Sequence, residues 1–157
     1  MRVLPSTGGR ILAALRENLD AAKSAILASA FVSSSGIELL MPSLERLLAR
    51  GGTVSLYVTF NGGAFTEPRF FESLAPLERR FPGKVEVYLY PHATSLFHAK
   101  AFLFERADGT WAGIVGSANL THSALTGDNV EMAAVATPMA HVDVEAVLAE
   151  LSRLREQ

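Results

Sequence analysis

Hydrophobic and polar residues follow two kinds of pattern along this chain. Apolar residues that recur at about every third or fourth position predict amphipathic helices, and short apolar runs without that spacing predict buried strands. The helical pattern covers residues 9–22, 33–48, 66–77 and 144–154, and the strand pattern covers 24–32, 53–60, 84–90, 97–104, 111–116 and 130–136. Pro42 predicts a kink or a late start in the second helix, and Pro76 predicts an early end to the third.

The order of these elements predicts the fold class. The early strands alternate with helices, which favours parallel pairing. The strands at 97–104 and 111–116 are separated by a turn at 107–109 and predict an antiparallel hairpin. We therefore predict an α/β fold with a mixed, mainly parallel sheet and helices on both faces. All of these elements are needed for one core, so residues 1–157 are expected to form a single domain.

Composition and charge narrow the possible functions. The chain has 157 residues, of which 49% are hydrophobic, and this is enough for a substantial core. It has no cysteine, which excludes disulfides, thiolate metal sites and cysteine nucleophiles. The formal net charge of −2 argues against tight non-specific binding to nucleic acid through a basic surface, but not against a local basic cleft. No signal-peptide pattern or membrane-spanning run is present, so we expect a cytoplasmic protein that does not bind membranes.

Polar residues interrupt the apolar pattern in the second half of the chain. His98 and Lys100 lie two positions apart in an expected strand, and Asn129 and Glu131 lie two positions apart at the start of another. Residues two apart in a strand share one face of the sheet. Burial of an unpaired charge among apolar residues is costly. We therefore expect these pairs and the Gly-Ser-Ala-Asn turn at 116–119 to meet in one site.

These segments together resemble the signature of the phospholipase D superfamily. The segments are His-Ala-Lys at 98–100, Gly-Ser-Ala-Asn at 116–119 and Asn-Val-Glu at 129–131. The resemblance is strongest to the nuclease branch, which contains small bacterial endonucleases and phospholipase D-like restriction enzymes, and it extends from about Ala25 to Val135. It implies a phospholipase D-like α/β/α sandwich.

One position departs from the family pattern. The family usually has an aspartate five residues after the lysine, and this chain has Glu105 there. Strand alternation places Glu105 on the opposite face from Lys100, so we do not include it in the site. Restriction-enzyme members of the family often lack this aspartate as well, which favours a nuclease over a lipase.

The residue types also fit phosphodiester chemistry. Such a site needs a nucleophile, cations or donors for the non-bridging oxygens, and an acid for the leaving oxygen. We expect His98 to act as the nucleophile through a phosphohistidine, with Lys100 beside it as the cation. Asn119 can donate to the phosphoryl oxygens, and Glu131 can accept the second ring N–H of His98. The expected substrate-binding residues are Gly116, Ser117 and Asn129.

One catalytic role is left unfilled by a single chain. No second His-x-Lys segment exists, because His92, His122 and His141 all lack a lysine two residues later. The resemblance implies that two motif copies form one site, and hence a homodimer in which the second His98 protonates the leaving group. It implies no metal and no cofactor, because two Lys100 side chains supply the positive charge.

We therefore expect a metal-independent nuclease that acts on nucleic acid, with DNA as the expected substrate. One alternative is a lipid phosphodiesterase or phosphatidyl transferase. Another is a nuclease module that needs a partner in a larger restriction or helicase-linked system. Non-catalytic interpretations also exist: a solvent-facing pair at the sheet edge for His98 and Lys100, an ordinary turn for 116–119, and a surface residue for Glu131.

Overall fold

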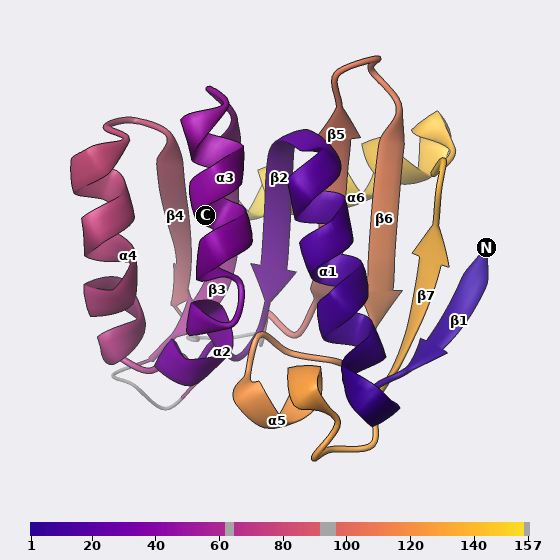
Figure 1. Cartoon of the computed structure of the whole chain (residues 1–157), viewed down its shortest axis with the longest axis horizontal. Coiled ribbons are helices and arrows are strands. Elements are labelled where there is room, and N and C mark those ends of the chain that lie inside the picture. Colours follow the sequence, from indigo (N-terminus) through magenta and orange to yellow (C-terminus); the bar gives the residue numbers. More distant parts are fainter. Residues whose placement is uncertain (62–64, 92–96, 156–157) are drawn as a thin grey trace.

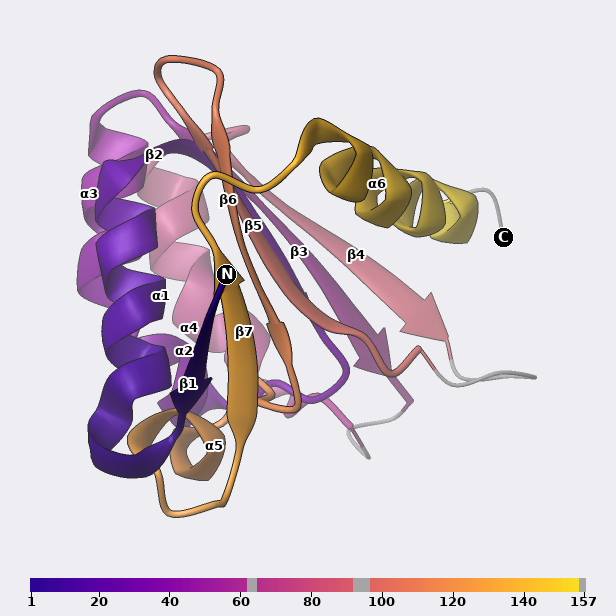
Figure 2. The same ribbon diagram turned by 90° about the vertical axis from the view of Figure 1, so that its right-hand side faces the viewer.

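A seven-stranded sheet forms the centre of the protein, with helices on both of its faces (Figures 1 and 2). The computed structural model describes residues 1–61, 65–91 and 97–155. The strands are β1 (Arg2–Pro5), β2 (Ala22–Ser29), β3 (Thr53–Phe60), β4 (Val85–Pro91), β5 (Lys100–Arg106), β6 (Trp111–Gly116) and β7 (Met132–Ala136). The helices are the 3-10 helix η1 (Thr7–Gly9) and α1 (Arg10–Ala21), α2 (Ser34–Glu38), α3 (Met41–Ala49), α4 (Arg69–Arg80), α5 (His122–Thr126) and α6 (His141–Arg155).

The strand order is β1-β7-β6-β5-β2-β3-β4. The mixed α/β sandwich is confirmed, but the expectation of a mainly parallel sheet needs correction. In the described part of the chain, parallel pairing is confined to β2–β3 and β3–β4, and the other four pairings are antiparallel. Parallel neighbours need a long crossover connection, usually a helix. A tight turn joins β5 to β6, and the connection from β6 to β7 holds only the short α5, so these strands pair antiparallel.

The two faces of the sheet carry unequal layers. Helices α1 to α5 cover one face, and α6 crosses the other, as Figure 2 shows. Alternation along β2 builds both layers, because Ala25 and Leu27 face the larger core whereas Ala28 packs with Leu151 of α6. The prediction of helices on both faces is therefore confirmed. Among the described residues, no helix is long and apolar enough to cross a membrane.

The two prolines have different effects. The second predicted helix is divided into α2 and α3, and Pro42 lies in the first turn of α3, as a late start requires. The predicted early end at Pro76 is wrong, because α4 continues to Arg80. Pro76 is exposed, while Phe70 and Leu77 of the same helix are buried. Burial of the apolar face of α4 thus outweighs the backbone hydrogen bond that Pro76 cannot make.

Two strands begin later than predicted, and one was not predicted. β5 begins at Lys100 and β7 at Met132, so His98, Asn129 and Glu131 lie in the irregular segments that lead into these strands. The argument from strand alternation therefore does not apply to them. The unpredicted strand is β1, which is only four residues long and pairs with β7.

Candidate active site

The motif segments meet where the central strands end, at the lower end of the sheet in Figure 1. The carboxyl ends of β2 and β6 lie at this end of the sheet, beside the starts of the antiparallel strands β5 and β7. Ser29 at the end of β2 is paired with Lys100 at the start of β5, and Gly116 at the end of β6 is paired with Ala133. The topology alone thus brings the three motifs of the sequence together.

His98 and Lys100 are in direct contact. Nζ of Lys100 lies 2.9 Å from Nδ1 and 3.0 Å from Nε2 of the His98 ring. The same ammonium donates a hydrogen bond to the His98 carbonyl oxygen over 3.0 Å. An ammonium can only donate, and which ring nitrogen accepts from it depends on the tautomer of His98. The His98 side chain is exposed and Lys100 is half-buried, so the ring lies nearer to solvent than the lysine does.

Glu131 acts on Lys100 through charge and on Ser117 through a hydrogen bond. Burial lowers the pKa of Lys100, and the carboxylate of Glu131 partly offsets this shift. The Glu131 carboxylate accepts a hydrogen bond from the Ser117 hydroxyl. We expected the His98 ring N–H to be its donor, and in the described structure Ser117 takes that place. The backbone of Glu131 is held by the buried Ser6, whose N–H donates to the Glu131 carbonyl over 2.9 Å.

Asn119 joins the turn after β6 to the end of β2. Its Oδ1 accepts hydrogen bonds from the Phe31 backbone N–H over 3.1 Å and from the Ser29 hydroxyl over 3.4 Å. A backbone N–H can only donate, so this contact identifies which side-chain atom is the oxygen. Nδ2 of Asn119 makes no hydrogen bond to the described residues and remains a donor at the site.

A short arrangement of three chain segments continues the sheet beyond β2. Val32 forms isolated parallel bridges with Thr66 on one side and with Leu120 on the other. The residues just before these positions therefore lie side by side, namely Asn119, Phe31 and Phe65. The Phe31 ring stacks on Phe65 with centroids 5.3 Å apart and meets the His98 ring edge to face at 5.9 Å. The sequence did not assign either phenylalanine to the site, because Phe31 lies inside the apolar segment 24–32 that predicts a strand and Phe65 lies in the loop after the strand at 53–60.

Two of the predicted substrate-binding residues have structural roles. A Cβ at Gly116 would lie 2.2 Å from the Met132 carbonyl oxygen, so the close approach of β6 and β7 requires glycine there. The backbone N–H of Asn129 donates to the Ser123 carbonyl, and its own carbonyl accepts from Ser6. Within the described residues, the Asn129 side chain makes no hydrogen bond to the other motif residues. Ser117 is the one of the three that reaches another motif side chain.

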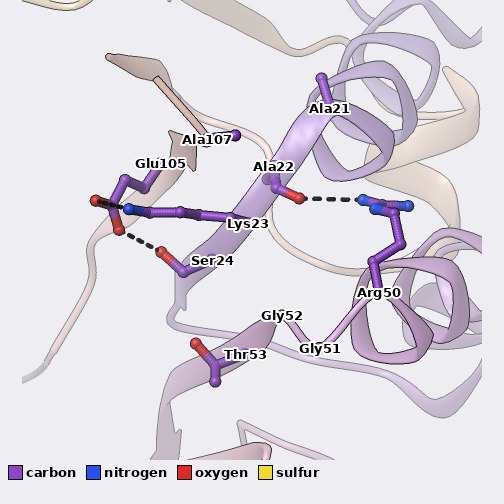
Figure 3. Close-up of a pocket in the computed structure, with 10 residues that line it drawn as sticks. All are labelled: Ala21, Ala22, Lys23, Ser24, Arg50, Gly51, Gly52, Thr53, Glu105 and Ala107. Carbon is purple, nitrogen blue, oxygen red and sulfur yellow. Dashed lines mark hydrogen bonds and ion pairs between the residues drawn. The ribbon is translucent and has the colours of Figure 1, made fainter. Parts of the chain in front are cut away.

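Glu105 lies at the end of the sheet away from the motif residues, whereas the sequence predicted only that it lies on the opposite face from Lys100. It pairs with Ser24 at the start of β2, accepts from the Ser24 hydroxyl over 2.9 Å, and forms an ion pair with Lys23 at 2.9 Å. These three residues line an open cleft of about 520 Å³ together with Arg50 and the Gly51–Thr53 segment (Figure 3). This cleft contains none of the motif residues.

The other histidines do not join the site in the described structure. His122 lies 3.6 Å from Asp128, and His141 lies 3.1 Å from Glu145, both at the surface. His92 lies outside the described residues. Among the described residues, no group of three or more His, Asp or Glu side chains is arranged to hold a metal ion.

Comparison with known proteins adds a family and a fold. Residues 15–151 match the model of the domain family described as "Cardiolipin synthase, PLD-like domain". No curated protein is significantly similar to the sequence. Among solved structures, the phospholipase D family member Nuc from Salmonella typhimurium is 20% identical with a TM-score of 0.73, over 99% of this chain and 93% of Nuc.

Two further structures are similar. NucT from Helicobacter pylori is 17% identical with a TM-score of 0.65, over 99% of this chain and 91% of NucT. Yeast tyrosyl-DNA phosphodiesterase is 11% identical with a TM-score of 0.58, over 86% of this chain and 31% of the yeast protein. The TM-scores show a common fold, and identities this low show nothing beyond it.

Proposed function

The chain belongs to the family of phospholipase D-like domains, and we propose that it is a nuclease that cleaves nucleic-acid phosphodiester bonds through an intermediate on His98. The family match confirms the resemblance found in the sequence and with it the enzyme class, a phospholipase D-like phosphodiesterase. The observation that carries the proposal is the Lys100 ammonium, 2.9 Å from Nδ1 of the His98 ring. A cation beside a ring nitrogen suits attack on an anionic phosphodiester.

The proposed reaction has two steps that share one intermediate. In the first, a ring nitrogen of His98 donates its lone pair to phosphorus, a P–N bond forms, and the P–O bond to the leaving nucleoside breaks. The leaving oxygen takes a proton from an acid. In the second, water attacks phosphorus, the P–N bond breaks, and the proton of the water passes to the same acid, now a base. Histidine is regenerated, and the products are an alcohol and a phosphate monoester.

The other motif residues have supporting roles in this proposal. The Lys100 ammonium and Nδ2 of Asn119 stabilise the charge on the non-bridging oxygens. Glu131 favours the charged form of Lys100, because its carboxylate partly offsets the effect of burial on the lysine pKa. The Ser117 hydroxyl donates to Glu131, which fixes the carboxylate beside the cation. Gly116 allows β6 and β7 to approach closely at the turn. The backbone hydrogen bonds of Asn129 hold the segment that leads into β7.

The acid comes from a second copy of the chain in this proposal. His122 is paired with Asp128 and His141 with Glu145, and among the described histidines only His98 contacts a motif residue. A two-fold axis beside His98 would place the partner's ring across the phosphodiester, with one ring as nucleophile and the other as acid. Closed two-fold dimers are the commonest oligomers. The proposed mechanism needs neither metal nor cofactor.

Nucleic acid is the favoured substrate, and a lipid phosphodiester is the second candidate. The yeast relative acts, by its name, on tyrosyl-DNA, which supports a nucleic-acid substrate for this fold. The description of the matched family names cardiolipin synthase, a lipid enzyme, and this favours the second candidate. We propose DNA as the substrate and the cytoplasm as the place of action. The chain could also depend on a partner in a larger restriction or helicase-linked system.

Cleavage assays with the purified chain test the proposal. DNA and RNA in single- and double-stranded form, and phosphatidylcholine vesicles, are incubated with the protein in a metal chelator. We expect nucleic-acid cleavage by the wild type and by the control variant His141→Ala, and a loss of at least about a thousandfold in His98→Ala. Quenching with an alkaline denaturant should trap the phosphorylated end of the nucleic acid on the protein, because the P–N bond of a phosphohistidine is stable in base and labile in acid.

The same experiments can contradict each part of the proposal. Full activity of His98→Ala would rule out the intermediate, and loss of activity in chelator alone would rule out metal independence. Release of choline without any nuclease activity would favour the lipid enzyme. A strictly monomeric molar mass in solution, with activity proportional to protein concentration, would exclude the shared site. An inactive chain that cuts only within a complex would identify a partner-dependent module.

A further inference from the structure

Two aromatic side chains lie beside the proposed nucleophile and have no role in phosphoryl transfer. The Phe31 and Phe65 rings, here called the aromatic pair, are stacked with centroids 5.3 Å apart at an interplanar angle of 29°. The Phe31 ring also lies 5.9 Å from the His98 ring. Both phenylalanines are half-buried, so part of each side chain reaches the surface next to the exposed His98. Among the described residues, neither phenylalanine belongs to the two core clusters, and Phe31 contacts the ring of His98.

The backbone of Phe31 is fixed by the site itself. Its N–H donates to Oδ1 of Asn119 over 3.1 Å, and its carbonyl oxygen accepts from the Ser29 hydroxyl over 2.7 Å. Both polar backbone groups of Phe31 are therefore held by side chains from the end of β2 and from the Asn119 turn. The bridge between Val32 and Thr66 places Phe65 alongside. The aromatic pair is thus ordered before a ligand arrives, which reduces the entropic cost of binding to it.

The net charge of the chain favours a source of affinity for nucleic acid in addition to phosphate contacts. Phosphate contacts give nucleic-acid binding through Lys and Arg, and the formal net charge here is −2. Lys100 is also partly desolvated, which lowers its pKa. Aromatic side chains bind bases by stacking without any charge, at about 1–3 kcal/mol per base. A stacking contact beside a site with few cations would hold a nucleic acid while its phosphate is attacked.

We propose that the aromatic pair is a stacking platform for the base next to the cleaved phosphodiester, and that the site therefore takes single-stranded nucleic acid. This inference rests on the proposed nuclease function. In a duplex each base is stacked on its neighbours, so a base can reach a protein ring only after unstacking, at a cost of a few kcal/mol. A single strand offers its bases at little cost. The platform thus selects the strand form through base stacking, independently of the phosphate chemistry.

The test combines a change in the protein with a change in the substrate. Phe31→Leu and Phe65→Leu keep an apolar side chain but remove the aromatic face. The substrates are a single-stranded DNA oligonucleotide, the same oligonucleotide with abasic residues on both sides of the cleaved bond, and its duplex. Phe81→Leu, at the end of α4, is the matched control. We compare kcat/KM for each combination, and Kd for the uncleaved oligonucleotides in a His98→Ala background.

We expect the wild type to cleave the normal strand at least about tenfold faster than the abasic strand and the duplex. Each leucine variant at the aromatic pair should lose about tenfold on the normal strand, with most of the loss in Kd, and almost nothing on the abasic strand. Phe81→Leu should match the wild type. This dependence on the base distinguishes stacking from a purely structural role, which would weaken cleavage of both strands equally.

Several results would overturn the inference. Equal cleavage of normal and abasic strands by the wild type would do so, even if the leucine variants failed to fold. Equal losses on both strands would mean that the aromatic pair only packs the loop, and faster cleavage of the duplex would reverse the strand assignment. Failure of the proposed function is a separate outcome, because the wild type would then cleave none of the nucleic acids.

Discussion

The side-chain oxygen of Asn119 accepts a hydrogen bond from the backbone N–H of Phe31, 3.1 Å away. This contact joins a motif residue in the turn after β6 to the residue that follows the end of β2, 88 positions earlier in the chain. It uses the oxygen of the amide and leaves Nδ2 as a donor. One side chain thus fixes the loop that carries an aromatic ring and, in the proposed mechanism, donates a hydrogen bond to a phosphoryl oxygen.

Replacement of Asn119 by aspartate separates these two roles. The carboxylate of Asn119→Asp still accepts from the Phe31 N–H, so we expect a melting temperature close to that of the wild type. The donor is lost and a negative charge faces the phosphate, so kcat/KM should fall by at least about a hundredfold. Thermal melting and cleavage assays measure the two effects. Near wild-type cleavage by this variant would remove Asn119 from the proposed set of phosphate donors.

Glu131→Gln should change the pH dependence of cleavage. Burial lowers the pKa of Lys100 and the Glu131 carboxylate partly offsets this, so loss of the carboxylate lowers the lysine pKa further. If the reaction needs the lysine cation, the alkaline limb of the kcat/KM profile should move to lower pH in the variant. Glu145→Gln on α6 is the control and should leave the limb unchanged. An alkaline limb at the same pH in Glu131→Gln would contradict this account of Glu131.

The same shift has a consequence for stability. A lysine whose pKa is lowered by folding binds fewer protons in the folded state than in the unfolded state, between the two pKa values. The protein should therefore gain stability from this group as the pH rises through that window. Lys100→Met removes the charge, so its stability advantage over the wild type should be largest at neutral pH and should shrink at alkaline pH. Urea unfolding at several pH values measures the difference.

The motif residues could be predicted because charge is a local signal. His98, Lys100 and Glu131 stand out in apolar surroundings, and their convergence follows from strand pairings that the element pattern suggests. Phe31 gave no such signal, because its position in the site depends on the bridges from Val32 to Thr66 and Leu120, which are distant in sequence. Periodicity describes one element at a time and does not contain these long-range contacts.

The errors in the fold have the same origin. β1 is four residues long and is formed through its pairing with β7, at the other end of the chain. Pro76 was expected to end α4 because proline disfavours a helix interior, but burial of Phe70 and Leu77 on the opposite side outweighs that local preference. The antiparallel pairing of β2 with β5, which makes the sheet less parallel than expected, is likewise a tertiary contact.

Gly36→Ala should destabilise the protein and disturb the site. A Cβ at Gly36 would lie 2.2 Å from the Leu120 carbonyl oxygen and 2.7 Å from the Thr121 Cα, both backbone atoms of the segment after Asn119. Overpacking of this kind costs about 1–3 kcal/mol. We expect a loss of that size in urea unfolding, together with reduced cleavage. Ser35→Ala, an exposed neighbour in α2, is the control. Unchanged stability of Gly36→Ala would show that α2 can move away from the turn at no cost.

Glu105→Gln tests the position where the family usually has an aspartate. Glu105 is bound to Lys23 and Ser24 at the end of the sheet away from His98, so we expect kcat/KM to stay at the wild-type value. Partial burial raises the pKa of Glu105, but the hydrogen bonds from Lys23 and Ser24 outweigh this, and its net pKa is lowered. A carboxyl with a lowered pKa stabilises the fold above its unfolded pKa, and this contribution is lost as the pH falls.

The Glu105→Gln variant should therefore be slightly less stable than the wild type at neutral pH, by less than about 1 kcal/mol for a pair this exposed. The difference should vanish in acid, where the wild-type carboxyl is itself protonated. The same substitution at Glu131 should impair cleavage, so the two glutamine variants form a matched pair. If Glu105→Gln loses activity while its unfolding is unchanged, the end of the sheet that carries Lys23 must communicate with the His98 site. The distance between Glu105 and the His98 site along the sheet would then not be a separation of function.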